Sequence, residues 1–338
     1  MSVLPGSFAV LVATGLAAVL FAPFVAAEHR RHGELRVGVA LLRFAVLLYA
    51  VALACYVLLP FPGSPACYEP QWQPFAAFRS TAGLEQFACN IALFVPLGAL
   101  LRRGPAAAAL VGGAVSAVVE LTQLTGMWFL LPCPHRVFDV DDVLANTAGA
   151  ALGGVFGPLL RRVPTTARDR PAEPRPVSAP RRLLGMSCDL LLLWWLGVAC
   201  ARGAEVVLWL TGAEPDTWWE ASALWFAPAV VLLGAMLLSG GSSLGQHAVC
   251  LRARAPTRPT AAALLRWASG IGGFAAAQGM CTAVLGEADA TLGVLWCAVH
   301  ACGVMHTRDH RGITGLVSGL EVIDARRRQR APTAARST

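Results

Sequence analysis

The fold is decided by residues 138–154, FDVDDVLANTAGAALGG, in which three carboxylates run directly into an apolar segment of small residues. An ionised carboxylate at the edge of a long apolar helix loses hydration, so its presence there requires a reason. Helical positions three, four and seven apart share a face, which places Asp139, Asp142 and Asn146 on one stripe. Asp139 and Asp141 could each cap the helix by accepting hydrogen bonds from its first amides, and Asp141 is the expected cap because it points away from the stripe.

The composition excludes a single soluble globule. Of the 338 residues, 56% are hydrophobic and only 14% are charged, and the mean hydropathy is +0.58. Apolar runs that reach or approach the roughly 20 residues needed to cross a hydrocarbon core recur between short charged loops. The sequence therefore predicts an all-α, polytopic helical membrane protein with about nine transmembrane helices. Basic loops normally stay in the cytoplasm, which places the N-terminus outside and the C-terminus inside.

Charge and cysteine usage narrow the range of partners. All 27 basic residues are Arg, and they fall in loops beside apolar runs, so we expect contact with membrane lipids and not with nucleic acid. The ten cysteines form no CxxC pair and no zinc-type spacing with histidine, and we expect neither a metal site nor a cofactor. Cys67 and Cys133 fall in loops expected outside the cell, where a disulfide between them is possible.

Composition also divides the chain into two membrane domains. Residues 1–160 form the first and residues 182–323 form the second, and residues 161–181 between them are rich in Arg and Pro. Such a segment is typical of an extended, poorly ordered cytoplasmic linker. Residues 324–338 are basic and are expected to form a disordered tail.

Polar residues of the first domain are expected to converge near its outer membrane surface. A Glu inside an apolar span demands a partner because burial disfavours its charge. Arg136, in the loop before the stripe, could pair with a carboxylate or bind a lipid phosphate. These polar groups could equally be interhelical hydrogen-bond partners that only fix packing. The candidates are Asn90, Glu120, Gln123, Arg136, Asp139, Asp142 and Asn146.

The second domain contains a second pair of candidates, Arg182 and Asp189, seven residues apart on one helical face. About 10 Å of helix rise separates them, so they need not touch each other. Asp189 is an intramembrane acid without a local partner in sequence, which makes it a site candidate in its own right. The glycines in residues 240–249 form no phosphate loop because no Lys follows, and a short strand-like or interfacial stretch fits that segment better.

Three polar blocks in residues 37–160 resemble, in order, those of the VanZ family of bacterial membrane proteins. The blocks are NIALFVPLG at 90–98, ELTQ at 120–123, and Arg136 with DVDDVLANTAG at 139–149. Residues 179–322 are similar to an RDD domain, a membrane module named for an Arg and two Asp. Arg182 and Asp189 match its first pair, and GSSLGQ at 241–246 resembles its loop, but the Asp expected near 314–315 is missing.

These resemblances imply a multi-pass protein of the bacterial cell membrane. The VanZ family is linked to tolerance of glycopeptide antibiotics, particularly teicoplanin, without an agreed molecular activity, and the RDD family has a suggested transport role. The first hypothesis is therefore a protein that binds, moves or shields an envelope lipid, a lipid-linked cell-wall precursor or an amphipathic glycopeptide, with the acids meeting amines. The second is an enzyme on a lipid-linked envelope substrate with Glu120 or Asp142 as acid or base, although no nucleophile is evident and catalytic residues stay unassigned.

Overall fold

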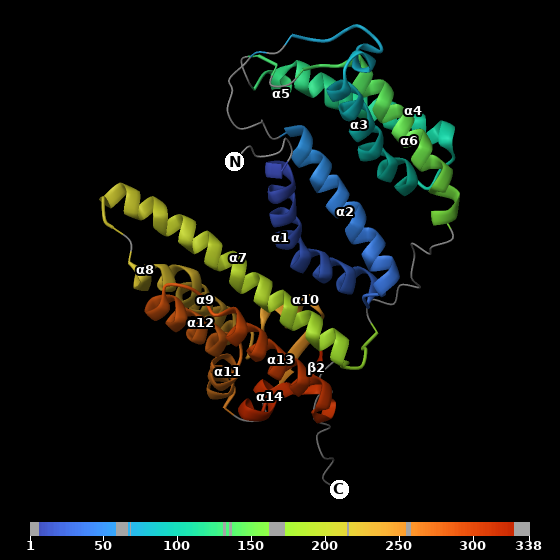
Figure 1. The fold of residues 1–338 in the computed structure, drawn as a ribbon. Helices are drawn as coiled ribbons and strands as arrows, with labels where there is room; N and C mark the ends of the chain where they lie inside the picture. The colour runs from blue at the N-terminus through green and yellow to red at the C-terminus, as the bar shows by residue number, and fades with distance from the viewer. Residues whose placement is uncertain are drawn as a thin grey trace. The chain divides into compact units, whose positions relative to one another are not determined.

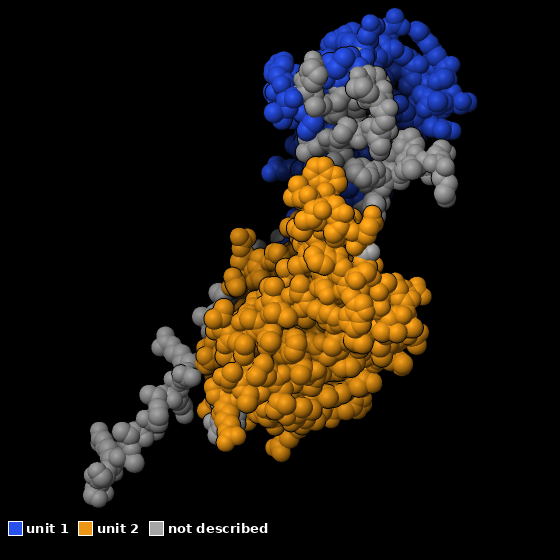
Figure 2. Space-filling model, turned by 90° about the vertical axis from the view of Figure 1, so that its left-hand side faces the viewer, with its two compact units in different colours: residues 1–17, 36–167 blue, residues 18–35, 168–338 orange. Residues whose placement is uncertain are grey.

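Two compact units make up the protein, and the computed structural model describes most of both (Figure 2). Unit 1 comprises residues 1–17 and 36–167, and unit 2 comprises residues 18–35 and 168–338. The described residues are 7–58, 67, 69–130, 133–134, 137–161, 173–214, 216–254 and 258–327.

The predicted membrane architecture is confirmed. Among the described residues, eight helices are long and apolar enough to cross a membrane, and a further apolar helix over Ala290–His306 is shorter. These correspond to the nine or so expected spans, while the orientation of the chain across the membrane stays a prediction. The described part of the chain is all-α apart from one small sheet of two strands.

Unit 1 is a helical bundle in which α3, α4 and α6 lie side by side (Figure 1). Helix α3 begins where the Ser80 hydroxyl accepts a hydrogen bond from the Gly83 amide at 3.0 Å, and α4 begins with a proline, whose missing amide costs nothing there. The elements are α1 (Ser7–His32), shared by the two units, α2 (Val37–Leu58), η1 (Ala76–Arg79), α3 (Thr81–Leu100), α4 (Pro105–Leu124), α5 (Gly126–Phe129) and α6 (Val140–Leu160).

Close helix packing in unit 1 depends on glycines of α6. A Cβ atom added at Gly149 would lie 2.2 Å from the Ile91 carbonyl oxygen of α3, and one at Gly153 would lie 2.0 Å from the Val95 carbonyl oxygen. Backbone therefore contacts backbone along this seam, as the small-xxx-small spacing predicts. The same seam fixes how the polar ends of α3 and α6 face each other.

The longest helix of unit 2 is α7, and α9, α10, α12 and α13 pack against it (Figure 1). One apolar core joins Val25 of α1 to Cys188 and Leu251, and a second joins Leu193 to Trp225. The elements are α7 (Ala179–Thr211), α8 (Thr217–Ala221), η2 (Ser222–Phe226), α9 (Ala227–Leu238), α10 (Leu244–Ala248), β1 (Leu251–Arg254), α11 (Pro259–Ala268), α12 (Ile271–Leu285), α13 (Ala290–His306), η3 (Arg308–His310), α14 (Gly312–Ser318) and β2 (Glu321–Asp324).

The limits of the second domain differ from the expected ones. Strands β1 and β2 pair antiparallel, with Leu251 opposite Asp324, so the folded part extends beyond residue 323. Asp324 is buried and its Oδ2 accepts a hydrogen bond from Arg181 Nη2 at 2.7 Å. Arg181 itself lies in α7, so the end of the expected linker is helical. The tail expected from residue 324 therefore loses its first residue, Asp324, to the sheet, where this buried acid has Arg181 as its cationic partner.

The segment over residues 240–254 is also more ordered than a single strand-like stretch. Ser243 and Gln246 form a capping box, in which the Ser243 hydroxyl accepts from the Gln246 amide and the Gln246 side chain accepts from the Ser243 amide. This reciprocal cap satisfies the first free amides of a helix and starts α10 at Leu244. The strand β1 follows only after that short helix.

Candidate functional site

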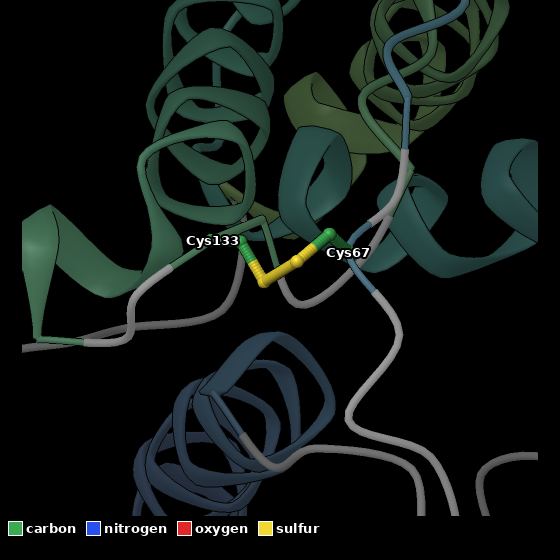
Figure 3. The surroundings of a disulfide bond; sticks show 2 residues. All are labelled: Cys67 and Cys133. Carbon is green, nitrogen blue, oxygen red and sulfur yellow. A yellow bond between two sulfur atoms is a disulfide. The ribbon is translucent and has the colours of Figure 1, made fainter.

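A disulfide ties together two loops at one end of unit 1. Cys67 and Cys133 are joined through their sulfur atoms, with Cα atoms 5.4 Å apart (Figure 3). The sequence left this pairing open, and the structure contains it. Disulfides persist in oxidising compartments, so the bond agrees with the expectation that this end of the unit lies outside the cytoplasm.

The segment after Cys67 lies along the start of α6. The Gln71 amide donates to the Phe138 carbonyl at 2.7 Å, and the Val140 amide donates to the Gln71 carbonyl at 3.3 Å. The Trp72 and Phe138 rings lie 4.5 Å apart between centroids. The loop before α3 is thus fixed to the polar stretch that opens α6.

The cap of α6 is Asp139, not Asp141 as the sequence suggested. The Asp139 carboxylate accepts a hydrogen bond from the Asp141 amide at 2.8 Å. Asp141 is buried, and its two oxygens accept from the backbone amides of Phe75 at 2.5 Å and Ala77 at 2.8 Å. Phe75 adopts a φ of +64°, so its amide turns away from regular pairing and needs this acceptor. Asp141 therefore anchors the loop.

Glu120 and Asp142 occupy different surroundings beside this anchor. Glu120 of α4 is 2% exposed, and its Oε2 accepts from the Asp139 amide at 3.2 Å. Both Asp142 oxygens lie 3.1 Å from the Gln86 side-chain nitrogen, and the Asn90 side chain also hydrogen-bonds to Asp142. Glu120 is thus enclosed and bonded to backbone, which counts against a direct acid–base role on a bound substrate. Asp142 is only half-buried and is held by neutral amides.

The remaining polar candidates extend the cluster inward. Asn146 is buried and its Nδ2 donates to the Ser116 hydroxyl at 2.9 Å, while its Oδ1 has no partner within the described residues. Gln123 is buried on α4. Arg136 lies outside the described residues. The structure therefore brings Asn90, Glu120, Asp139, Asp142 and Asn146 together, as the helical stripe predicts, and adds Asp141 and Gln86 to them.

The electrostatic character of this carboxylate cluster, which comprises Glu120, Asp139, Asp141 and Asp142, is acidic. Burial raises the pKa of Asp139; the hydrogen bond from the Asp141 amide opposes this shift and the Asp141 charge adds to it. Among the described residues, no group of His, Cys, Asp and Glu side chains is arranged to hold a metal ion. The cluster gathers four acidic side chains at one end of unit 1.

Large exposed aromatic side chains surround this end of unit 1. Phe75 and Phe78 belong to the anchored loop, and Trp128 and Phe129 follow α4. Trp72 is also exposed, and the Trp128 indole donates to the Thr122 hydroxyl at 3.2 Å. Aromatic rings of this kind favour the level of lipid headgroups, where one part of the ring is apolar and the other is wet.

Comparison with known families agrees with this arrangement. Residues 46–161 match the model of the VanZ/LLP1 family. The match covers about a third of the chain and contains α3, α4 and α6 with every described residue of the carboxylate cluster. No curated protein and no solved structure matches the chain. The VanZ-like domain suggests a membrane protein of the bacterial envelope that is linked to glycopeptide tolerance.

Two residues of the VanZ-like domain were missed by sequence reasoning. Gln86 lies one helical turn before Asn90, and this i, i+4 spacing of two amides on α3 is a signal that could have found it. Asp141 was assigned to a cap because its true partners are amides more than sixty residues earlier in the chain. No local pattern carries that contact.

Unit 2 places its two predicted residues beside one cavity of about 220 Å³. Asp189, which has no local partner in sequence, finds distant ones: its Oδ2 accepts from the Ser243 hydroxyl and its Oδ1 from the Gly245 amide, both at 2.6 Å. Arg182 is buried and donates to the His310 and Arg311 carbonyls, at 3.2 and 3.3 Å. Sequence reasoning missed a third charged residue there, Arg266 of α11.

Proposed function

We propose that the protein protects the bacterial envelope by binding an amphipathic ligand at the outer membrane surface through its VanZ-like domain. The ligand would be a teicoplanin-type glycopeptide or a lipid-linked envelope precursor, and the interaction needs no chemical turnover. One observation carries this proposal: the half-buried Asp142 carboxylate is held by neutral amides, with no Arg or His partner in the described structure. A carboxylate in that state has a net charge to offer a cationic group.

The acids of the cluster differ in their hydrogen-bond partners, and this difference supports different roles for them. Asp141 and Glu120 are bonded to backbone amides and hold the loop in place. Asp142 is bonded to the exposed side chain of Gln86, which can rotate away at little cost. A ligand amine can therefore replace the Gln86 amide on Asp142 without disturbing the anchor of the loop.

The aromatic rim supports an amphipathic ligand over a small polar one. Trp72, Phe75 and Phe78 are each more than half exposed, at 59%, 63% and 54%. They would contact the acyl tail or the aromatic core of the ligand at headgroup level, while its amine meets Asp142. The Cys67–Cys133 disulfide holds this rim against α6 and agrees with an extracytoplasmic setting.

Replacing Asp142 with Asn tests the proposal. A glycopeptide-sensitive bacterium expressing the full chain should tolerate teicoplanin, and D142N at equal membrane abundance should return sensitivity to that of cells without the protein. Calorimetric titration of teicoplanin into the full chain in lipid nanodiscs should show saturable binding that D142N abolishes. Glu85→Gln is the matched control, because Glu85 is an exposed acid on the same helix as Gln86.

The outcomes separate the hypotheses. Unchanged tolerance in D142N at equal abundance would refute the site and leave the carboxylates a packing role. Incubation of the purified protein with radiolabelled lipid-linked precursor distinguishes binding from turnover, and a product that disappears in D142N would establish the enzyme in place of the binding protein.

We further propose that residues 179–322 form an RDD-type membrane module, with a role in transport. This proposal is supported by the position of Arg182 and Asp189, the residues that carry the resemblance, beside a single cavity. The Asp expected near Thr314 is missing, so a mechanism that needs both family acids does not extend to this chain.

A further inference from the structure

The cavity of unit 2 contains an excess of buried positive charge. Arg182 and Arg266 are 4% and 5% exposed, and both line the cavity together with Asp189. The two guanidinium groups and the single carboxylate are close enough to interact electrostatically. With two cations and one anion, the three side chains have a net charge of +1. A buried charge without a counter-ion costs several kcal/mol, so a cavity of this kind favours an anion.

The two arginines differ in how their donors are used. Arg182 donates to the carbonyl oxygens of His310 and Arg311. Arg266 Nη1 is buried and has no hydrogen-bond partner within the described residues. Asp189 is not its hydrogen-bond partner in the described structure, where the two oxygens of that carboxylate accept from Ser243 and Gly245, each at 2.6 Å. Arg266 therefore keeps a donor for a group that the protein itself does not supply.

His300 lines the same cavity. Its Nδ1 lies 2.9 Å from the Trp296 carbonyl oxygen, and its Nε2 lies 2.9 Å from the Ser269 carbonyl oxygen. The imidazole also stacks on the Trp296 ring, with centroids 5.1 Å apart and planes 17° apart. These contacts fix the ring at the wall of the cavity.

Most of the remaining wall of the cavity is apolar. Met186 of α7, Ile271 and Phe274 of α12, and Val304 of α13 line it. A volume of about 220 Å³ is below the roughly 300–1,000 Å³ of sites that enclose a whole drug-sized ligand. The cavity can therefore enclose an oxyanion with the first part of an attached chain, and the remainder of that chain must extend outside it.

We propose that this cavity is a binding site for the phosphate group of an anionic membrane lipid, with Arg266 Nη1 as its principal donor. Arg182 contributes positive charge, Asp189 holds α10 in place, and the first part of the lipid lies against Met186 and Phe274. A lipid of net charge −1 balances the +1 of the three side chains, whereas a zwitterionic lipid leaves it uncompensated. Guanidinium donors suit phosphate because its oxygens match their planar geometry.

Native mass spectrometry of the full chain, purified in detergent and delipidated, tests the site. Dioleoylphosphatidylglycerol, dioleoylphosphatidylcholine and inorganic phosphate are titrated in parallel. We expect one phosphatidylglycerol to bind per chain, with weaker binding of phosphatidylcholine and no stabilising effect of inorganic phosphate. Arg266→Gln should weaken phosphatidylglycerol binding at least about tenfold, as expected for a lost hydrogen bond between charged groups. Arg202→Gln is the control, because Arg202 is exposed on α7 and pairs with Glu205.

Each other outcome contradicts the proposal. Equal binding of phosphatidylglycerol to wild type and R266Q would show that Arg266 is not part of the site. Equal stabilisation by inorganic phosphate would show that the cavity binds free phosphate from solvent and not the lipid. The thermal midpoint of lipid-free R266Q provides a second measurement. A site for a missing counter-ion predicts a midpoint no lower than that of lipid-free wild type, because an uncompensated charge is removed. A folding failure of R266Q would show that Arg266 is structural.

Discussion

The carboxylate cluster of unit 1 and the arginine cavity of unit 2 both place charge near or inside apolar helices, yet they compensate it differently. In unit 1 the buried acids Asp141 and Glu120 accept hydrogen bonds from backbone amides. In unit 2 Arg182 donates to backbone carbonyls, but Arg266 Nη1 has no partner within the described residues. Charged groups that hydrogen-bond to the backbone hold a loop in place, whereas a charged group without a partner can bind a ligand.

The difference predicts opposite responses to removal of a charge. Removing an acid that holds backbone amides leaves those amides buried without acceptors, and stability falls. Removing an uncompensated cation relieves a desolvation cost, and stability is kept or rises. The half-buried Asp142 lies between these cases, since the side-chain amides that hold it can find water when it is replaced.

Asp141→Ala should give the largest effect. Two hydrogen bonds from the Phe75 and Ala77 amides to a charged acceptor are lost, and each is worth about 1.5–3 kcal/mol, so we expect unit 1 to lose about 3–5 kcal/mol. Hydrogen exchange followed by mass spectrometry should show loss of protection in residues 69–80. Glu85→Ala, an exposed acid nearby, should change nothing. Preserved protection in D141A would contradict the anchoring role.

Asp189→Asn should give the second largest effect. The free energy of unfolding of unit 2 should fall by about 2–4 kcal/mol, because the two buried arginines then lack the acid that lines the cavity with them. The effect should be partly reversed by Arg266→Met in the same chain, with a coupling energy of about 1–3 kcal/mol. Chemical denaturation of the two single variants and the double variant measures this coupling. Additive effects of the two changes would show that Arg266 and Asp189 do not share one charge balance.

Reduction of the disulfide should affect unit 1 alone. The Cys67–Cys133 bond closes a loop of 66 residues in sequence separation, and Cys67→Ser should cost about 2–3 kcal/mol. The described cysteines of unit 2 are free, so Cys200→Ser is a suitable control. Peptide-resolved hydrogen exchange should show faster exchange in unit 1 and no change in unit 2. A reductant effect of equal size in both units would contradict this separation.

The smallest effects should be opposite pH dependences in the two units. Burial raises the pKa of Asp139, so the fold binds that proton more tightly than the unfolded chain, and stability falls as pH rises from 3.8 through the folded pKa. Burial, with a contribution from Arg30, lowers the pKa of His247, so stability falls as pH drops below 6.5. The pH dependence of the thermal midpoint should lose the first slope in D139N and the second in H247Q. Persistence of either slope in its variant would assign it to another group.

Much of unit 1 was predictable because its information is local. Apolar runs of membrane length predict the helices, and the spacing of Asp139, Asp142 and Asn146 predicts the stripe that meets Glu120 and Asn90. The disulfide was only a possibility at the level of sequence, because two loops expected on one side of the membrane need not bring their cysteines together. The role of Asp141 could not be predicted, because it depends on the backbone course of a distant loop whose Phe75 has a positive φ.

Unit 2 was harder to predict because its site is assembled from several helices far apart in sequence. Arg266 follows a loop rich in Arg and looks like one more surface charge, and only the packing of α11 against α14 and α9 buries it. The capping box of Ser243 and Gln246 was a local signal for α10, but the contact of Ser243 with Asp189 was not. Local patterns define elements, while tertiary packing decides which charges lose water.

The pairing of β1 with β2 sets the point in translation at which unit 2 can complete its fold. Seventy residues separate Arg254, the end of β1, from Asp324, the end of β2. At about 5–20 residues per second, a nascent chain carries β1 as an open strand edge for roughly 4–14 seconds, during which Arg181 also lacks its acid. Unit 2 can therefore close only after Asp324 has been synthesised, and a premature stop before β2 would release a protein with an exposed edge and an unpaired buried arginine.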